Sequence, residues 1–346
     1  MKGIFIRLVV LCLAFMLVVS ADGIAQEERI GTNAASELLI PVGARYLAMG
    51  GNPVASAQGV EAIYWNPAGV ARSNYAADAM FSHMTYIADV NINFAALSLR
   101  FGDFGTIGFS IKALDIPDIA VTTEFAPDGT GEVLSPQFVT AGLTYSRALT
   151  DRISVGATIN LISEDLESAR VSATGFAFDM GVQYQGLAGV EGLGIGIVLK
   201  NLGPSMSFSG SGLLNDAQLV GVDRQSTPLS IEAQKDELPS YIVLGVSYAM
   251  SMGEYSKLEL IGSFQDNNYT DNLARFGAEY VYNDLFSLRG GYSLAPNTDT
   301  DVFIYGFTAG AGIHYDFSNI GITVDYAYRD TDFFDSSNIF SIRLGF

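Results

Sequence analysis

The sequence is poor in charge, in histidine and in cysteine. Only 16% of its 346 residues are charged, and it contains two histidines and one cysteine, Cys12. Cys12 lies in an N-terminal segment that we expect to be removed, so the mature chain would have no disulfide or thiolate chemistry. Acidic residues outnumber basic ones by 37 to 18, giving a formal net charge of −19. This balance argues against nucleic acid as a partner, because phosphate binding requires clustered Lys and Arg.

Long hydrophobic runs are also scarce. A membrane-spanning helix needs about 20 consecutive apolar residues, and only the N-terminus approaches that length, with the unbroken run Leu8–Val19 behind a basic start. Small residues then offer cleavage after Ala21 or Ala25. We therefore predict a signal peptide at residues 1–25, with a retained anchor helix as the alternative.

Strict alternation of apolar and polar residues is abundant. In the last strand, residues 338–346, Phe340 and Ile342 face one way while Ser341 and Arg343 face the other, and the chain ends on Phe346. The polar faces of such segments carry mainly Gly, Ser, Thr, Ala and Asn rather than Lys and Glu. This pattern is expected when the polar face lines a crowded lumen and the apolar face meets lipid.

About fourteen segments alternate in this way. They are residues 79–87, 92–101, 105–113, 137–149, 153–165, 172–185, 194–202, 240–250, 255–265, 273–282, 286–294, 304–317, 320–328 and 338–346. Connections after even strands are tight, whereas those after odd strands are mostly longer, above all 114–136 and 203–239. The pattern predicts an all-β fold: a transmembrane antiparallel β-barrel of about 14 strands over residues 79–346, in the lipid of the bacterial outer membrane.

Residues 26–78 precede the barrel and do not alternate. They are too apolar for a solvated tail, and a lumen of about fourteen strands leaks unless it is filled. We therefore predict that this N-terminal segment is a hatch, or plug, inside the barrel. Pro67 and Gly69 fix a turn in it, and Trp65 is expected to be a packing anchor, with ligand contact as the alternative.

Residues that could support catalysis or bind metal are few. His314 and Asp316 share one face of a strand, which favours a hydrogen-bond network in the lumen over an acid–base pair, and His83 lies elsewhere. The loops Asp266–Asn272 and Asn297–Asp301 are rich in Asp and Asn, so calcium is conceivable, but a solvated loop is favoured. We predict no catalytic, cofactor-binding or metal site, and no enzyme activity.

Charged residues of both signs fall on the lumen side of the predicted strands. They are Arg100, Lys112, Lys257, Glu259, Arg275, Glu279, Arg289, Asp325 and Arg343. They could line a selective path, or they could pair to tie the hatch to the wall. We favour the second interpretation.

Two N-terminal stretches carry a family resemblance. LLIPVGARYLAMGG at Leu38–Gly51 and EAIYWNPAGVA at Glu61–Ala71 resemble the PorV/PorQ family of outer-membrane proteins, which is itself similar to the FadL-type transporters. The same order of motifs continues in the barrel at Thr122–Glu132, Leu149–Val155 and Asn201–Gly210. The resemblance implies a FadL-like barrel of about fourteen strands with an N-terminal hatch.

The resemblance leaves two functions open. The resemblance to PorV/PorQ proteins implies that the protein is a platform or shuttle for protein secretion and surface attachment, as in type IX secretion. In that case loops 114–136 and 203–239 would contact secreted cargo proteins or secretion-system components. The alternative is a FadL-like uptake channel, in which a hydrophobic small molecule binds in the lumen between hatch and wall.

Overall fold

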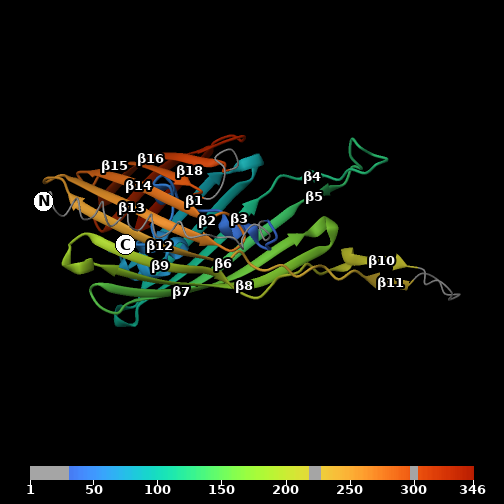
Figure 1. The fold of residues 1–346 in the computed structure, drawn as a ribbon, viewed down its shortest axis with the longest axis horizontal. Coiled ribbons are helices and arrows are strands. Elements are labelled where there is room, and N and C mark those ends of the chain that lie inside the picture. Colours follow the sequence, from blue (N-terminus) through green and yellow to red (C-terminus); the bar gives the residue numbers. More distant parts are fainter. Residues whose placement is uncertain (1–30, 218–226, 297–302) are drawn as a thin grey trace.

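The computed structural model of the protein describes residues 31–217, 227–296 and 303–346, so the predicted signal peptide lies outside the described residues. Within the described chain, fourteen strands form one closed barrel in which every neighbouring pair is antiparallel (Figure 1). They are β1 (Ala77–Thr85), β2 (Asn91–Arg100), β3 (Thr106–Asp115), β6 (Pro136–Ala148), β7 (Ile153–Leu166), β8 (Val171–Gln185), β9 (Leu193–Leu202), β12 (Tyr241–Ser251), β13 (Ser256–Asn267), β14 (Leu273–Tyr282), β15 (Phe286–Leu294), β16 (Tyr305–Phe317), β17 (Ile320–Thr331) and β18 (Ser337–Gly345). Pairing of β1 with β18 closes the ring. The predicted all-β barrel is confirmed, with nearly the predicted strand bounds.

The outer surface of the barrel is apolar and its inner surface is polar. On β7, Leu161 points outward and is 60% exposed, whereas Ser154 and Thr158 point inward and are buried. A soluble β-sandwich has the opposite arrangement, with polar residues outside and apolar residues inside. The separation of the two faces follows from the period-2 alternation. Closure pairs the backbone groups of every edge, which a hydrocarbon environment requires.

The two ends of the barrel differ. Short turns such as 283–285 and 318–319 occupy one end, and long connections carrying the hairpins β4 (Ile119–Ala120)/β5 (Val133–Leu134) and β10 (Leu214–Ala217)/β11 (Thr227–Ser230) project from the other (Figure 1). Exposed aromatic residues surround the short-turn end: Phe101, Phe104, Tyr145, Tyr255, Tyr282, Phe286, Tyr315 and Phe317. Aromatic girdles mark membrane interfaces, and short turns mark the periplasmic side, so the hairpins lie on the extracellular side.

Residues 31–76, called the luminal segment below, form short helices. These are η2 (Ser36–Leu39), α2 (Ala44–Leu47), η3 (Gly59–Glu61), α3 (Ala62–Trp65) and η4 (Pro67–Arg72). The start of η4 follows from its sequence, because Asn66 caps it by accepting a hydrogen bond from the Ala68 amide and Pro67 occupies the first turn. Within the described residues, no helix is long and apolar enough to cross a membrane.

The barrel wall surrounds the luminal segment. A Cβ added to Gly181 of β8 would lie 1.9 Å from Asn66 Oδ1, and one added to Gly291 of β15 would lie 2.2 Å from the Gly50 nitrogen. These two strands are far apart around the ring, so the segment touches widely separated parts of the wall. Wall glycines therefore allow the close approach of its backbone.

The main apolar core lies between the luminal segment and the wall. Tyr46, Leu47 and Met49 pack there with Met80 and Met84 of β1. Both methionines point inward, which explains why the alternation of β1 is blurred in the sequence: its inner face meets apolar residues rather than water.

Candidate ligand site

A hollow lies on each side of the luminal segment inside the barrel. The extracellular cavity has a volume of about 320 Å³, and Leu47, Gly50 and Gly51 form part of its floor. The periplasmic vestibule has a volume of about 1050 Å³ and is lined by Arg45 among others. Because Tyr46, Leu47 and Met49 are at most 2% exposed, helix α2 and the residues after it fill the space between the two hollows.

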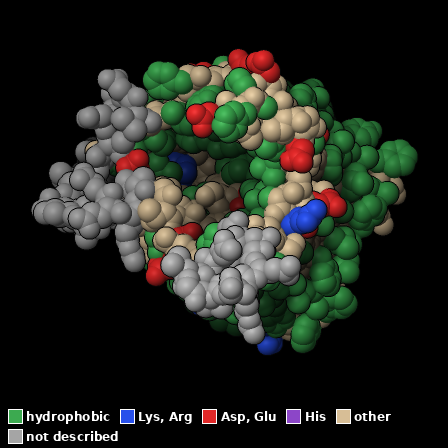
Figure 2. Space-filling model, turned by 90° about the vertical axis from the view of Figure 1, so that its right-hand side faces the viewer, with side chains coloured by type: hydrophobic (Ala, Val, Ile, Leu, Met, Phe, Trp, Pro, Cys, Tyr) green, Lys and Arg blue, Asp and Glu red, His purple; other side chains and the backbone are tan. Residues whose placement is uncertain are grey.

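Six aromatic side chains line the extracellular cavity. Those from the luminal segment are Tyr64 and Trp65, and those from the wall and its loops are Tyr86, Tyr241, Phe303 and Tyr305. Figure 2 shows the hollow at this end of the barrel. A concave site of this size with an aromatic lining suits an apolar ligand of a few to a dozen or so heavy atoms.

Trp65 serves as both packing anchor and cavity wall. It is 5% exposed, and its ring meets the rings of Tyr64 and Tyr46 edge-on at centroid distances of 5.0 and 6.5 Å. Trp65 therefore fits both predicted roles, because it packs against other aromatic rings and also lines the cavity.

Polar groups stand at defined places in the same cavity. The Tyr86 and Tyr305 hydroxyls hydrogen-bond each other at 2.6 Å, and the Arg329 guanidinium lies 4.2 Å from the centroid of the Tyr305 ring. Arg275 Nη1 donates to Gln265 Oε1 at 2.6 Å. The cavity therefore combines an aromatic body with two cations, a composition that can recognise more than bulk hydrophobicity.

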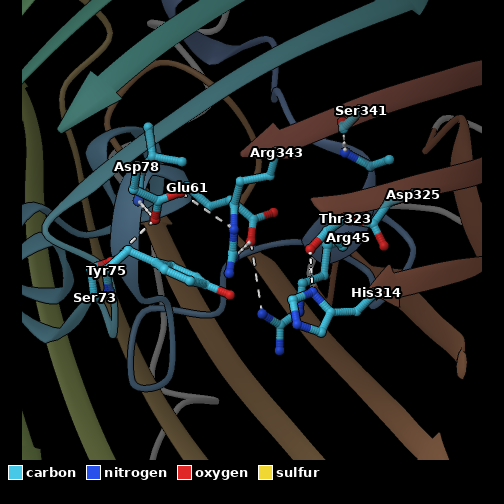
Figure 3. Close-up of polar contacts among 12 residues, drawn as sticks. Arg45, Glu61, Ser73, Tyr75, Asp78, His314, Thr323, Asp325, Ser341 and Arg343 are labelled. Carbon is cyan, nitrogen blue, oxygen red and sulfur yellow. Dashed lines mark hydrogen bonds and ion pairs between the residues drawn. The ribbon is translucent and has the colours of Figure 1, made fainter. Parts of the chain in front are cut away.

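A network of ion pairs joins the luminal segment to the periplasmic half of the wall. Arg45 contacts Glu279 at 2.8 Å, and Glu279 also contacts Arg289 at 2.6 Å. Glu61 pairs with Arg343 at 3.1 Å (Figure 3). Burial raises the pKa of Glu61, while Arg45 and Arg343 act in the opposite direction. Such buried pairs fix one arrangement of segment and wall, because removing either partner leaves a buried charge.

Six of the nine predicted lumen charges connect wall and luminal segment directly or through this network. Glu279, Arg289, Asp325 and Arg343 belong to the network, Glu259 lies 4.0 Å from Arg45, and the Lys112 ammonium donates to the carbonyls of Glu37 and Ile40. The other three differ: Lys257 pairs with Asp284 at the surface, Arg100 is exposed, and Arg275 lines the extracellular cavity.

The two histidines lie apart. His314 Nδ1 is 2.8 Å from Thr323 Oγ1, and its Nε2 is 3.3 Å from Asp316 Oδ1, so His314 contacts two polar side chains at the vestibule wall. His83 contacts Asn93 on the neighbouring strand.

Of the two loops considered for calcium, the structure describes one. In 266–272, the Asn267 amide group donates to the Asp271 carbonyl, while 297–301 lies outside the described residues. Among the residues that the structure describes, no three His, Cys, Asp or Glu side chains are grouped as metal ligands.

Sequence reasoning missed several of these residues. Arg329 was assigned to the loop after 320–328, but β17 continues to Thr331 and Arg329 faces the lumen. Residues four apart on a strand point to the same side, so the lumen position of Asp325 could have predicted that of Arg329. Arg45 and Glu61 stand in short helices without periodicity, so only the folded structure shows that they meet the wall.

No protein-family profile and no curated protein matches this chain. Solved structures do match. The Ralstonia pickettii toluene transporter TbuX aligns at 14% identity over 88% of this chain and 98% of its own, with a TM-score of 0.56. The Pseudomonas putida toluene transporter TodX aligns at 15% identity (86% and 95%, TM-score 0.54), and a Pseudomonas aeruginosa FadL homologue at 11% (88% and 98%, TM-score 0.51).

The fold is FadL-like. A closed fourteen-stranded barrel of this kind with an apolar exterior is a protein of the bacterial outer membrane, which confirms the predicted localisation and its contact with membrane lipid. The resemblance to PorV/PorQ and the type IX secretion role have no support in these comparisons.

Proposed function

We propose that this protein is an uptake channel for small hydrophobic molecules. The observation that carries the proposal is the aromatic cavity at the extracellular end, directly above helix α2. A ligand entering from outside would bury its apolar surface against Trp65 and Tyr305 before it crosses the barrel. The FadL-like fold and the names of TbuX and TodX as toluene transporters support this function, although at 14–15% identity they contribute only the fold.

The luminal segment would act as the hatch of this channel. It fills the space between cavity and vestibule, so passage requires residues 44–51 to move. Their backbone is held by side chains of the wall: Gly50 N donates to Thr308 Oγ1 at 3.0 Å, and Ala44 N donates to Ser341 Oγ at 2.8 Å. Single hydrogen bonds of this kind contribute about 1 kcal/mol each, which is compatible with a segment that is fixed at rest and can be displaced.

The secretion-platform hypothesis has less support. Its partners would bind the extracellular hairpins, where Phe125 is 95% exposed. An exposed apolar residue on a loop is ordinary on a protein surface, and the aromatic cavity has no role in that hypothesis.

Trp65 provides a direct test of ligand binding, because it is the single tryptophan of the chain and lines the cavity. We expect toluene to change its fluorescence saturably in the purified, detergent-solubilised protein, and to enter proteoliposomes faster than it enters empty liposomes. Tyr305→Ala should weaken binding by roughly tenfold through lost aromatic contact.

Tyr315→Ala is the matched control, since Tyr315 lies on the same strand but is 59% exposed on the outer surface. It should bind as the unaltered protein does. A Trp65 signal that responds to no apolar probe, or that responds identically in Tyr305→Ala, would contradict the proposed function.

A further inference from the structure

The extracellular cavity contains a buried arginine whose hydrogen-bonding capacity is largely unused. Arg329 is 7% exposed. Its Nη2 donates to Ser337 Oγ at 3.5 Å, and its Nε has no hydrogen-bond partner in the described part of the chain. The guanidinium carbon lies 4.2 Å from the centroid of the Tyr305 ring and 5.5 Å from that of Tyr86. A guanidinium has five N–H donors, and those without a protein partner can bind an oxyanion.

A second arginine in the cavity has a neutral partner. Arg275 donates to Gln265 Oε1, an oxygen that also accepts from Asn52 Nδ2. Among the described residues, neither Arg275 nor Arg329 has a carboxylate within 4.0 Å, although Asp271 lines the same cavity.

The arginines of the periplasmic vestibule behave differently. Arg45, Arg289 and Arg343 each contact at least one carboxylate. Among the described residues, the three vestibule arginines thus each have an acid, whereas Arg275 and Arg329 of the extracellular cavity have none. Burying an uncompensated cation is costly, so a ligand that carries a negative charge would be stabilised beside these two arginines.

We propose that the ligand of this cavity is a small aromatic or aryl-alkyl molecule with one carboxylate group. This inference rests on the proposed uptake function and names its substrate class. The aromatic body would pack against Trp65 and Tyr64, and the carboxylate would accept hydrogen bonds from Arg329 and Arg275. Arginine and carboxylate match in geometry as well as charge, whereas a neutral hydrocarbon leaves both cations unpaired. The volume of about 320 Å³ accommodates a phenylalkanoate.

The test compares an acid with its own neutral ester. Binding of 4-phenylbutyrate and of methyl 4-phenylbutanoate is followed by Trp65 fluorescence in the detergent-solubilised full chain at pH 7.5. We expect the acid to bind at least about tenfold more tightly than the ester, because a hydrogen bond to a charged group exceeds a neutral one by this factor or more. Arg329→Met should remove this preference while leaving ester affinity within about twofold.

Arg100→Met is the matched control, since Arg100 is exposed at the periplasmic end of β2, and it should keep the preference. Equal affinities for acid and ester in the unaltered protein would overturn the proposal while leaving the uptake function standing. Failure of both probes to bind would instead contradict the uptake function. If Arg329→Met does not fold, the acid-to-ester ratio of the unaltered protein decides alone.

Discussion

At the scale of single residues, Glu37 is the most unusual group of the luminal segment outside the ion-pair network. It is a carboxyl that is 3% exposed, and one of its oxygens, Oε1, has no hydrogen-bond partner in the described chain. Burial, followed by the neighbouring Glu164 carboxyl on β7, raises the pKa of Glu37 to about 7. The nearby Lys112 ammonium partly opposes this shift, and it donates to the carbonyls of Glu37 and Ile40. Helix η2 therefore contains a buried carboxyl group, that of Glu37, with a pKa raised to about 7.

The pKa of Glu37 predicts that the packing of η2 depends on pH. The raised pKa means that the folded segment binds a proton that the unfolded segment, with a pKa near 4.5, has released. Stability from this group is complete below about pH 4.5 and is lost as the pH rises through about 7. Hydrogen exchange of amides 35–40, corrected for intrinsic rates, should show protection falling by up to about 3 kcal/mol between pH 5 and pH 8.

Glu37→Gln, which stays neutral, is the control for that effect and should give the same protection at both pH values. Protection in the unaltered protein that rises between pH 5 and pH 8 would contradict the assignment of the proton to Glu37.

At the scale of elements, glycines of the barrel wall leave room for residues 48–50 of the luminal segment. A Cβ added to Gly291 would lie 2.2 Å from the Gly50 nitrogen, whereas one added to the adjacent Gly290 would meet only the Thr308 carbonyl at 3.9 Å. We therefore expect Gly291→Ala to displace this part of the luminal segment, at a cost of roughly 1–3 kcal/mol, and Gly290→Ala to leave it in place.

Passage of a small solute through proteoliposomes distinguishes these two variants. Gly291→Ala should raise it several-fold, because the displaced residues form the partition between cavity and vestibule. Equal, low passage in both variants would show that the segment tolerates the methyl group and that residues 48–50 do not control the path.

The strands and the luminal segment also differ in how far the sequence predicts them. Alternation predicted the barrel strands with the exception of β1, whose pattern is blurred, because lipid and lumen impose opposite requirements on successive side chains. The aromatic cavity could not be predicted, because no periodic pattern connects the residues that line it. Trp65 and Tyr305 lie far apart in the chain, and they line one cavity only because short helices of irregular spacing pack against the wall. The lumen position of Arg329 was not predicted, because the predicted strand ends at residue 328 whereas β17 continues for three more residues, to Thr331.

At the scale of the whole molecule, the apolar outer surface is the property on which the other inferences depend. On β17, Val324 is 48% exposed, and its cross-strand partners are Ile342 and Ile313. In a soluble barrel such a band would face water and would favour aggregation. In an outer-membrane barrel it faces lipid, where a lysine costs about 2–4 kcal/mol at the midplane and less toward the interfaces.

Two lysine substitutions of exposed apolar residues separate these environments. Val324→Lys should lower the free energy of unfolding from lipid vesicles by about 1 kcal/mol or more, because Val324 lies between the midplane and the periplasmic interface. Phe125→Lys changes a residue that is 95% exposed, on the connection between β4 and β5 beyond the barrel, so its effect should stay within about 0.5 kcal/mol. Urea titration of the protein folded in vesicles measures both. Equal and small effects would mean that water surrounds Val324, and the barrel would then be no membrane protein, because lipid alone makes the two sites unequal.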